Sequence, residues 1–182
     1  QGQQRRQRTE AASGARKTDG YLRAVIVRQE SQVIRRITSV ITRPISGSAI
    51  SIPEMMRVLV DQEALDWDAA WWICERVFAY TNHTVLPEAL ESWSKELMGR
   101  VLPRHLQIIE EIDRRFRTLV VSAGENVSRM AVVDDQNQSV RMANLAIVGS
   151  HSVNGVARLH SDILTANIFP DFHRVFPKKF NN

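Results

Sequence analysis

Polar side chains that could bind a hydroxylated ligand gather in one short segment, directly after an apolar run. The run ends at Gly149, and residues 150–154 then supply two hydroxyls, an imidazole and an amide. The imidazole of His151 can donate a hydrogen bond to a sugar hydroxyl, and the amide of Asn154 can donate and accept. Glycine permits tight or positive-φ turns, so Gly149 and Gly155 would let the backbone approach a ligand closely. We therefore expect His151 to contact a ligand, whereas Asn154 is either a ligand contact or a turn-stabilising amide.

A second candidate is His83, which lies in the segment Tyr80-Thr81-Asn82-His83-Thr84 just ahead of an expected helix start. Polar groups at such a position can face a cleft, because the first N–H groups of a helix lack partners within it. The alternative is that Asn82 or Thr84 caps the helix and His83 has no role in a site. The residue pattern alone leaves both interpretations open.

Other candidate chemistries have less support. The five histidines are scattered and form neither HxxxH nor HExxH, so we predict no metal site. The carboxylate pairs Glu110-Glu111 and Asp134-Asp135 are adjacent in sequence and should diverge, so we interpret them as solvated surface rather than a glycosidase pair. Cys74 lies in an apolar helix and is interpreted as a buried small hydrophobic residue. The tryptophans could stack on sugar rings, but their spacing among apolar neighbours favours core packing: Trp67, Trp71, Trp72 and Trp93.

The elements that position these groups are expected to be mostly helices from residue 49 onward. Ser51 and Glu54 have the spacing of a capping box, with Pro53 in the first turn, which predicts a helix through about residue 60. Asp66 can cap a second helix that runs to about Tyr80.

Shorter elements follow. Thr84 and Pro87 are expected to open a short helix that ends near Trp93, Ser94 can cap another, and Pro103 begins a longer amphipathic helix. The apolar residues of that longer helix are Leu106, Ile109, Ile112, Phe116 and Leu119. We then expect a strand over residues 130–133, a turn over 134–139, and a buried helix or strand from 140 onward. A helix over 156–164 and a loop over 169–182 should follow. The fold class is α/β and rich in helix.

The charge is divided unevenly along the 182 residues. Residues 1–48 hold ten basic and three acidic groups, whereas the rest of the chain holds 14 and 17. The second part is mildly acidic, which argues against its binding a nucleic-acid backbone. Residues 1–20 are predicted to be disordered, and residues 21–45 suggest one or two strands. A basic arm that grips nucleic acid is the functional alternative to a solvated or non-native tail.

Composition also indicates a compartment. A single cysteine cannot form an internal disulfide, and we see no secretory leader and no apolar stretch of ~18 residues that would cross a membrane. We therefore expect a cytoplasmic protein without a membrane segment.

Three segments carry a resemblance to a known family. Residues 149–160 resemble the GSHxVNGVAxxH segment of the glycogen, starch and maltodextrin phosphorylases, and residues 79–91 and 102–109 resemble two further segments of the same enzymes. All three stand in the family's order and approximate spacing. The resemblance covers about residues 49–182, which suggests a basic segment 1–48 followed by part of a phosphorylase N-terminal catalytic domain.

The resemblance implies a fold and an activity. Phosphorylases have the GT-B type fold of two Rossmann-like domains, and they release α-D-glucose 1-phosphate from α-1,4-glucan with orthophosphate. They carry pyridoxal phosphate on a lysine of the C-terminal half and are commonly homodimeric. The resemblance places His151 at the glucosyl unit, near its 6-hydroxyl, with Asn154 beside it and His83 along the same cleft. It assigns no catalytic and no cofactor-binding residue to this chain, which is similar only to the later part of the N-terminal half.

Two departures shape the functional expectation. The family's Asn-Asp-Thr-His-Pro segment does not precede the helix that starts near residue 51, and residues 1–48 match nothing familiar in these enzymes. We therefore hypothesise a fragment of a phosphorylase gene with a foreign or frame-shifted N-terminus and an early stop, inactive alone. The alternatives are a non-catalytic carbohydrate-binding remnant and an RNA-associating protein with a basic tail.

Overall fold

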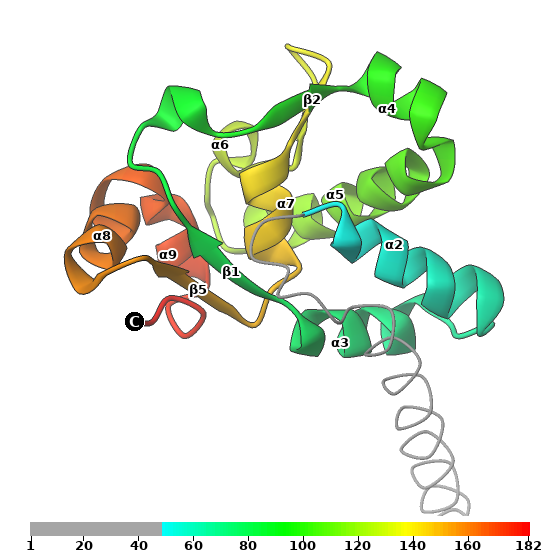
Figure 1. The fold of residues 1–182 in the computed structure, drawn as a ribbon, viewed down its shortest axis with the longest axis horizontal. Helices are drawn as coiled ribbons and strands as arrows, with labels where there is room; N and C mark the ends of the chain where they lie inside the picture. The colour runs from blue at the N-terminus through cyan, green and yellow to red at the C-terminus, as the bar shows by residue number, and fades with distance from the viewer. Residues whose placement is uncertain (1–48) are drawn as a thin grey trace, which may run out of the picture. The chain divides into compact units, whose positions relative to one another are not determined.

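A computed structural model describes residues 49–182, and these residues form an α/β fold rich in helix, as predicted (Figure 1). The predictions for residues 1–48, namely disorder, one or two strands and a basic arm, lie outside the described residues. The helical elements are α2 (Ser51–Arg57), the π-helical turn η1 (Val58–Gln62), α3 (Trp67–Val77), the 3-10 turn η2 (Pro87–Ala89), α4 (Lys95–Val101), α5 (Pro103–Ser122), α6 (Val127–Met130), α7 (Met142–Val148), α8 (Arg158–Ile163), the π-helical turn η3 (Leu164–Ile168) and α9 (Pro170–Val175).

The strands form two small sheets. They are β1 (Ala79–Asn82), β2 (Ser92–Ser94), β3 (Val133–Asp134), β4 (Ser139–Arg141) and β5 (Ser152–Gly155). In the first sheet β1 and β5 run parallel, so that Ala79 lies opposite Ser152 and Asn82 lies opposite Gly155 (Figure 1). The second sheet is antiparallel, in the order β2-β4-β3.

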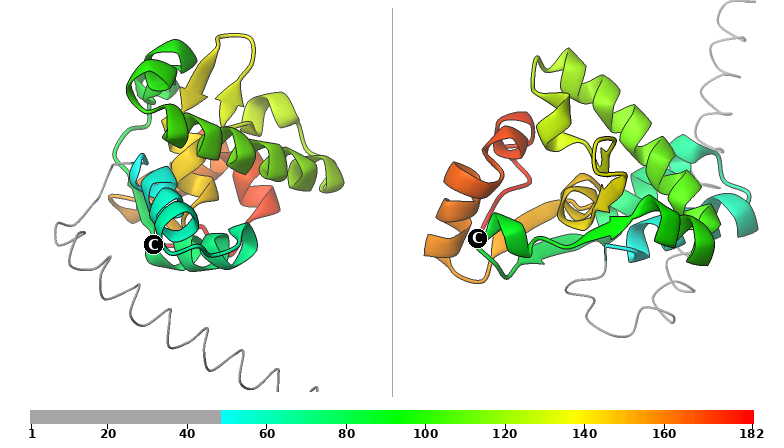
Figure 2. Two further views of the ribbon diagram at one scale, coloured as in Figure 1. Left: turned by 90° about the vertical axis from the view of Figure 1, so that its right-hand side faces the viewer. Right: turned by 90° about the horizontal axis from the view of Figure 1, so that it is seen from above.

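The core of the described residues lies between the helices and the parallel strands. Helix α2 packs against α3 and α5 (Figure 2), and every residue of α7 is buried. The buried apolar residues of α5 recur every three or four positions, as predicted, although Leu119 is 43% exposed: Ile108, Ile109, Ile112, Phe116 and Val120. Residues 140 onward, for which helix and strand were both open, form a short strand followed by a buried helix.

Helix starts set by local chemistry are confirmed in three places. The Asp66 carboxylate accepts a hydrogen bond from the Ala69 N–H at 3.0 Å, and the Ser94 hydroxyl accepts one from Leu97 N–H at 3.1 Å. Pro103 occupies the first turn of α5. The capping box at Ser51 is wrong: Ser51 lies inside α2, and no side chain caps that helix.

The Glu54 carboxylate of the expected capping box has other partners. It forms an ion pair with Arg57 on its own helix and lies 2.8 Å from Nε2 of His105 on α5. The hydrogen bond from Arg57 is the main reason that the pKa of Glu54 is lowered, although partial burial opposes it. The contact with His105 joins α2 to α5, and neither contact starts a helix.

Pairing between distant segments overrides several local predictions. The second helix ends at Val77 rather than near Tyr80, because residues 79–82 pair with β5. The helix expected up to Trp93 is a single 3-10 turn, since residues 92–94 pair with β4.

The strand and loop expected toward the end of the chain also need correction. The strand expected at residues 130–133 is shifted to β3, because α6, capped by the Asn126 side chain, runs to Met130. The loop expected over 169–182 contains α9, which has Pro170 in its first turn.

The tryptophans and the aspartate pair also differ in part from expectation. Trp72 is 46% exposed with the Arg76 guanidinium 3.8 Å above its ring centre, and Trp93 is 39% exposed, so core packing is wrong for these two. Asp134 is buried rather than solvated, because the turn after it wraps its carboxylate with hydrogen bonds. Cys74 is buried, as predicted, and that burial raises the pKa of its thiol.

Candidate functional site

The turn that carries His83 lies at the carboxyl end of β1. Parallel strands point their carboxyl ends to the same edge, where ligand sites of α/β proteins form. Asn82 is almost completely buried; its Nδ2 donates to the Tyr80 hydroxyl at 2.9 Å, and its Oδ1 accepts from the Thr84 N–H at 2.8 Å. Thr84 Oγ1 in turn accepts from the Leu86 N–H at 3.1 Å. Asn82 and Thr84 thus shape the turn, and the His83 side chain between them is exposed.

A cavity of about 310 Å³ extends along β1 to this turn. Its walls combine apolar side chains from α2, the start of β1 and α7 with polar groups from β1 and the turn. The lining residues that matter here are Ile52, Phe78, Met142, Ala146, Tyr80, His83, Glu91 and Ser150.

Two of the polar groups in this cavity have spare hydrogen-bonding capacity. Ser150 is 1% exposed, and its hydroxyl forms no hydrogen bond with any residue from 49 to 182. The Tyr80 hydroxyl accepts from Asn82 and keeps its own proton to donate, and burial raises the pKa of that phenol. An apolar wall with a few convergent hydroxyl, phenol and imidazole groups can hold a hydroxylated ring and fix its orientation.

His151 lies at the opposite end of the strand pair. Its backbone N–H donates to the Phe78 carbonyl at 2.9 Å, just before β1 begins. The six residues of extended chain from Phe78 to His83 are separated by five steps, which span roughly 16 Å. The His151 side chain is exposed and does not line the cavity, so the structure does not bring His151 and His83 together.

Asn154 lies in the middle of β5 and is bonded within the protein. Its Oδ1 accepts from the Thr81 hydroxyl at 3.1 Å, and its Nδ2 donates to the Gly155 carbonyl at 2.7 Å. It lines a different cavity, of about 370 Å³, together with residues of α8 and the segment 180–182. The amide therefore ties β1 to β5, which matches the stabilising alternative considered for it.

The two glycines of this segment are required by protein neighbours rather than by a ligand. A Cβ on Gly149 would lie 2.7 Å from the Ile52 side chain. A Cβ on Gly155 would lie 2.8 Å from His160 Cγ and from the Ser161 backbone nitrogen. Gly149 has a φ of −86°, so a positive φ is not what requires glycine at this position.

His160 is the residue near the site that the sequence patterns did not single out. It is buried, and its two ring nitrogens contact the Val156 N–H and the Thr84 carbonyl. The sequence feature that could have indicated its burial is its spacing from Leu164. Leu164 lies four positions later, on the same helical face, and is also buried.

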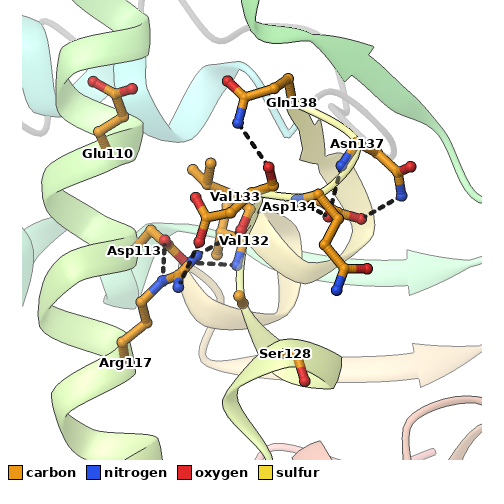
Figure 3. A network of polar contacts seen from close by, with 12 residues as sticks. Glu110, Asp113, Arg117, Ser128, Val132, Val133, Asp134, Asn137 and Gln138 are labelled. Carbon is orange, nitrogen blue, oxygen red and sulfur yellow. Dashed lines mark hydrogen bonds and ion pairs between the residues drawn. The ribbon is translucent and has the colours of Figure 1, made fainter.

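A polar network behind the site holds the β3–β4 hairpin against α5 (Figure 3). The buried Asp113 carboxylate accepts from Arg117 Nε at 2.6 Å and from the Val132 N–H at 2.7 Å. Arg117 also donates to the Val133 carbonyl at 2.7 Å. In the turn that follows, Asn137 bonds the Asp134 carboxylate and is the main reason that its pKa falls to about 2.

The described residues do not fit pyridoxal phosphate. That cofactor needs a lysine to carry it, and no lysine lines the cavity at His83. Lys95 pairs with Glu110 at 2.7 Å, and Lys179 donates to the Val148 carbonyl at 2.9 Å. Among residues 49–182, no group of three or more His, Cys, Asp and Glu side chains is placed to hold a metal, and no helix is long and apolar enough to span a membrane.

A parallel strand pair with a polar-rimmed cavity at its carboxyl end is an arrangement of α/β proteins that bind small ligands. A model of the family described as carbohydrate phosphorylase matches residues 42–182, and the chain belongs to that family. The match begins at residue 42, a few residues before the change in charge composition at about residue 48. The chain is 53% identical over 139 residues to the H isozyme of alpha-glucan phosphorylase from Vicia faba, which covers 73% of this chain and 16% of the relative.

Two other relatives show similar values. Identity is 52% to the cytosolic alpha-glucan phosphorylase 2 of Arabidopsis thaliana, over 73% of this chain and 16% of the relative. It is also 52% to the muscle form of glycogen phosphorylase of Homo sapiens, over 74% of this chain and 16% of the relative. The chain therefore spans about one sixth of the length of these relatives.

Proposed function

We propose that this chain is part of an α-1,4-glucan phosphorylase and supplies one wall of its glucosyl-binding cleft. The observation that carries the proposal is the position of His83, at the carboxyl end of β1 and at the rim of a cavity lined by the hydroxyls of Tyr80 and Ser150. In the complete enzyme the reaction would transfer a terminal glucosyl unit of the glucan to orthophosphate, releasing α-D-glucose 1-phosphate. We assign the enzyme to the cytoplasm and expect a homodimer.

The residues of the cavity would bind and orient sugar. The His83 imidazole and the hydroxyls of Tyr80 and Ser150 can each donate to a ring hydroxyl, and the apolar wall can pack against a sugar face. We retain His151 and Asn154 as proposed glucosyl contacts, but their positions make them contacts with another part of the glucan rather than with a ring beside His83.

The chemical step lies outside these residues. Pyridoxal phosphate, when bound to the family's lysine, supplies acid–base assistance through its phosphate group, and the part of the enzyme that holds it is proposed to lie beyond this chain. We therefore expect no glucose 1-phosphate from glycogen, orthophosphate and this chain, with or without added cofactor. Phosphorolysis by the purified chain would overturn this part of the proposal.

A direct test compares the two histidines. The chain is titrated with maltotriose, an α-1,4-linked glucose trimer, while the histidine ring protons are followed by NMR. We expect the His83 signals to shift and His83→Ala to weaken binding about fivefold, as for loss of one hydrogen bond to a neutral sugar hydroxyl. His151→Ala is the matched variant at the other end of the strands, with a smaller expected effect.

The same titration separates the alternatives. Binding at His83 without any turnover in a reconstituted full-length enzyme would indicate a carbohydrate-binding remnant. Failure of maltotriose to bind, combined with a salt-sensitive mobility shift of RNA, would favour the basic segment 1–48 as the functional part.

A further inference from the structure

His160 lies outside the sugar cavity, but it contacts the turn that carries His83. Its Nε2 is 3.2 Å from the Thr84 carbonyl oxygen, and its Nδ1 accepts from the Val156 N–H at 3.3 Å. A carbonyl can only accept and a backbone N–H can only donate, so these partners assign the proton to Nε2. The ring therefore bridges two backbone segments as one neutral tautomer.

The surroundings of His160 fix the ring in this position. The side chain is 8% exposed, and Gly155 packs against it without room for a Cβ, which would lie 2.8 Å from Cγ. The Gly155 N–H donates to the Ser161 hydroxyl at 2.9 Å, which draws the start of α8 toward the end of β5. The imidazole is thus held by β5 and α8 and reaches across to the turn after β1.

The turn itself has few other anchors. Val85 and Leu86 are 45% and 54% exposed, and the residues that follow them up to Ala89 are also exposed. On the strand side the turn is held by the Asn82 carboxamide, and on the helix side by the His160 contact with the Thr84 carbonyl.

We propose that His160 is a positioning residue for sugar binding, which holds the turn after β1 so that His83 faces the cavity. This inference rests on the proposed function of that cavity. His160 does not touch the sugar; its effect passes through the Thr84 carbonyl to the neighbouring residue. Loss of this single contact should lower sugar affinity while the fold is kept.

Two variants with amide side chains separate the two hydrogen bonds of the His160 ring, because each variant can keep only one of them. In His160→Gln the side-chain NH₂ can reach the place of Nε2 and donate to Thr84. In His160→Asn the shorter side chain can supply the acceptor in place of Nδ1 but cannot reach Thr84. We expect His160→Gln to keep maltotriose affinity within about twofold of the original chain, and His160→Asn to weaken it about fivefold, the value of one ordinary hydrogen bond.

A role confined to the fold would give a different result. If His160 only supported the start of α8, His160→Asn would retain affinity and His160→Gln would lose it, or both would lose it equally with lower melting temperatures. Either outcome would overturn the inference.

A second measurement keeps the inference testable when sugar binding itself fails. The Thr84 and Leu86 amides donate hydrogen bonds within the turn, so their hydrogen exchange reports its order without ligand. We expect faster exchange at both amides in His160→Asn and unchanged exchange in His160→Gln. Equal exchange in both variants would reject the positioning role. If the unsubstituted chain does not bind maltotriose but the two variants show the expected exchange pattern, the proposed function is rejected and the positioning role is supported.

Discussion

The two glycines that flank residues 150–154 differ in what crowds them. The neighbour of Gly149 is the Ile52 side chain, three atoms of which would lie within 3.0 Å of an added Cβ. A side chain of this kind can move to make room. The neighbours of Gly155 include the backbone nitrogen of Ser161 and the backbone carbon of His160, at 2.8 and 2.9 Å, and backbone of a helix start cannot yield without moving the helix. Gly155 therefore fixes the distance between β5 and α8.

Replacement of Gly155 should consequently destabilise the fold. We expect Gly155→Ala to lower the free energy of unfolding by about 1–3 kcal/mol, as for overpacking of a close contact. Gly99→Ala is the matched control, because a Cβ there meets only Leu106 at an ordinary 3.5 Å within α4, and should stabilise by about 0.5–1 kcal/mol. Urea unfolding followed by circular dichroism measures both, and equal effects of the two variants would contradict the packing argument.

The residue types of the candidate site could be predicted, but their grouping could not. His83, His151 and Asn154 were chosen because imidazole and amide groups suit a hydroxylated ligand. Their positions relative to one another depend on the register of β1 with β5, which joins Thr81 to a residue 73 positions later. No local pattern specifies such a pairing, so the separation of the two histidines and the contact from His160 become evident only in the structure.

At the scale of elements, the β3–β4 hairpin depends on one carboxylate. Asp134 accepts from the Gln136 and Asn137 backbone N–H groups at 3.0 and 3.1 Å and pairs with Arg141 at 2.7 Å. Asn137 is the largest cause of the lowered pKa of Asp134, about 2 against an ordinary 3.8, with Arg141 a smaller one. The turn is thus stabilised by the charged form of this side chain.

The hairpin should therefore be sensitive to acid. Because the pKa of Asp134 is lower in the folded chain, its contribution to stability is complete above pH 3.8 and is lost as the pH falls toward about 2. NMR titration of the carboxyl carbon should give a pKa near 2, with exchange of the turn amides rising over the same range. Asp134→Asn should remove this pH dependence of the turn, whereas Asp162→Asn, at an exposed position of α8, should leave it in place.

The C-terminal end of a second element, α7, is contacted by the half-buried lysine Lys179. Lys179 Nζ donates to the Val148 carbonyl at 2.9 Å and the Ile147 carbonyl at 3.3 Å, which are left without partners at the end of a helix. Burial lowers the pKa of Lys179, and its pairing with Glu75 only partly opposes this. The ammonium thus joins the C-terminal segment to the end of the most buried helix.

Removal of this ammonium should cost stability. We expect Lys179→Met to lower the free energy of unfolding by about 1–3 kcal/mol, the cost of leaving buried carbonyls unsatisfied. The neighbouring Lys178 is exposed, and Lys178→Met serves as the control with an expected change near zero. Thermal unfolding of the two variants decides the matter, and similar melting temperatures would show that the carbonyls find other partners.

Helix starts were easier to predict than strands for a physical reason. A cap such as Asp66 acts on an amide three residues away, so its signal lies within one turn of sequence. The strands β1 and β2 have four and three residues, too few for an alternating pattern, and form only because β5 and β4 lie beside them. The same cause explains why the helices predicted to reach about Tyr80 and Trp93 end earlier in the structure.

At the scale of the whole molecule, large apolar side chains remain exposed across several of the described elements. Val101, Val121, Val156 and Leu159 are 64%, 65%, 61% and 73% exposed. The segment of the chain that matches the relatives covers only 16% of their length, and in a complete phosphorylase we expect other parts of the polypeptide to cover such surface. On an isolated chain, exposed apolar surface drives association.

The isolated chain should therefore self-associate. We expect sedimentation velocity to show a weight-average mass that rises with protein concentration, and addition of salt to increase rather than reverse it, because the contacts are apolar. The double variant Val156→Lys and Leu159→Lys should reduce association by placing two charges on the most exposed apolar part of the α8 start. Asp162→Lys, an exposed substitution on the same helix, controls for the added charge and should change little. A single monomeric species at all concentrations, with a sharp and cooperative melt, would mean that this segment of the phosphorylase fold needs no further polypeptide to complete it.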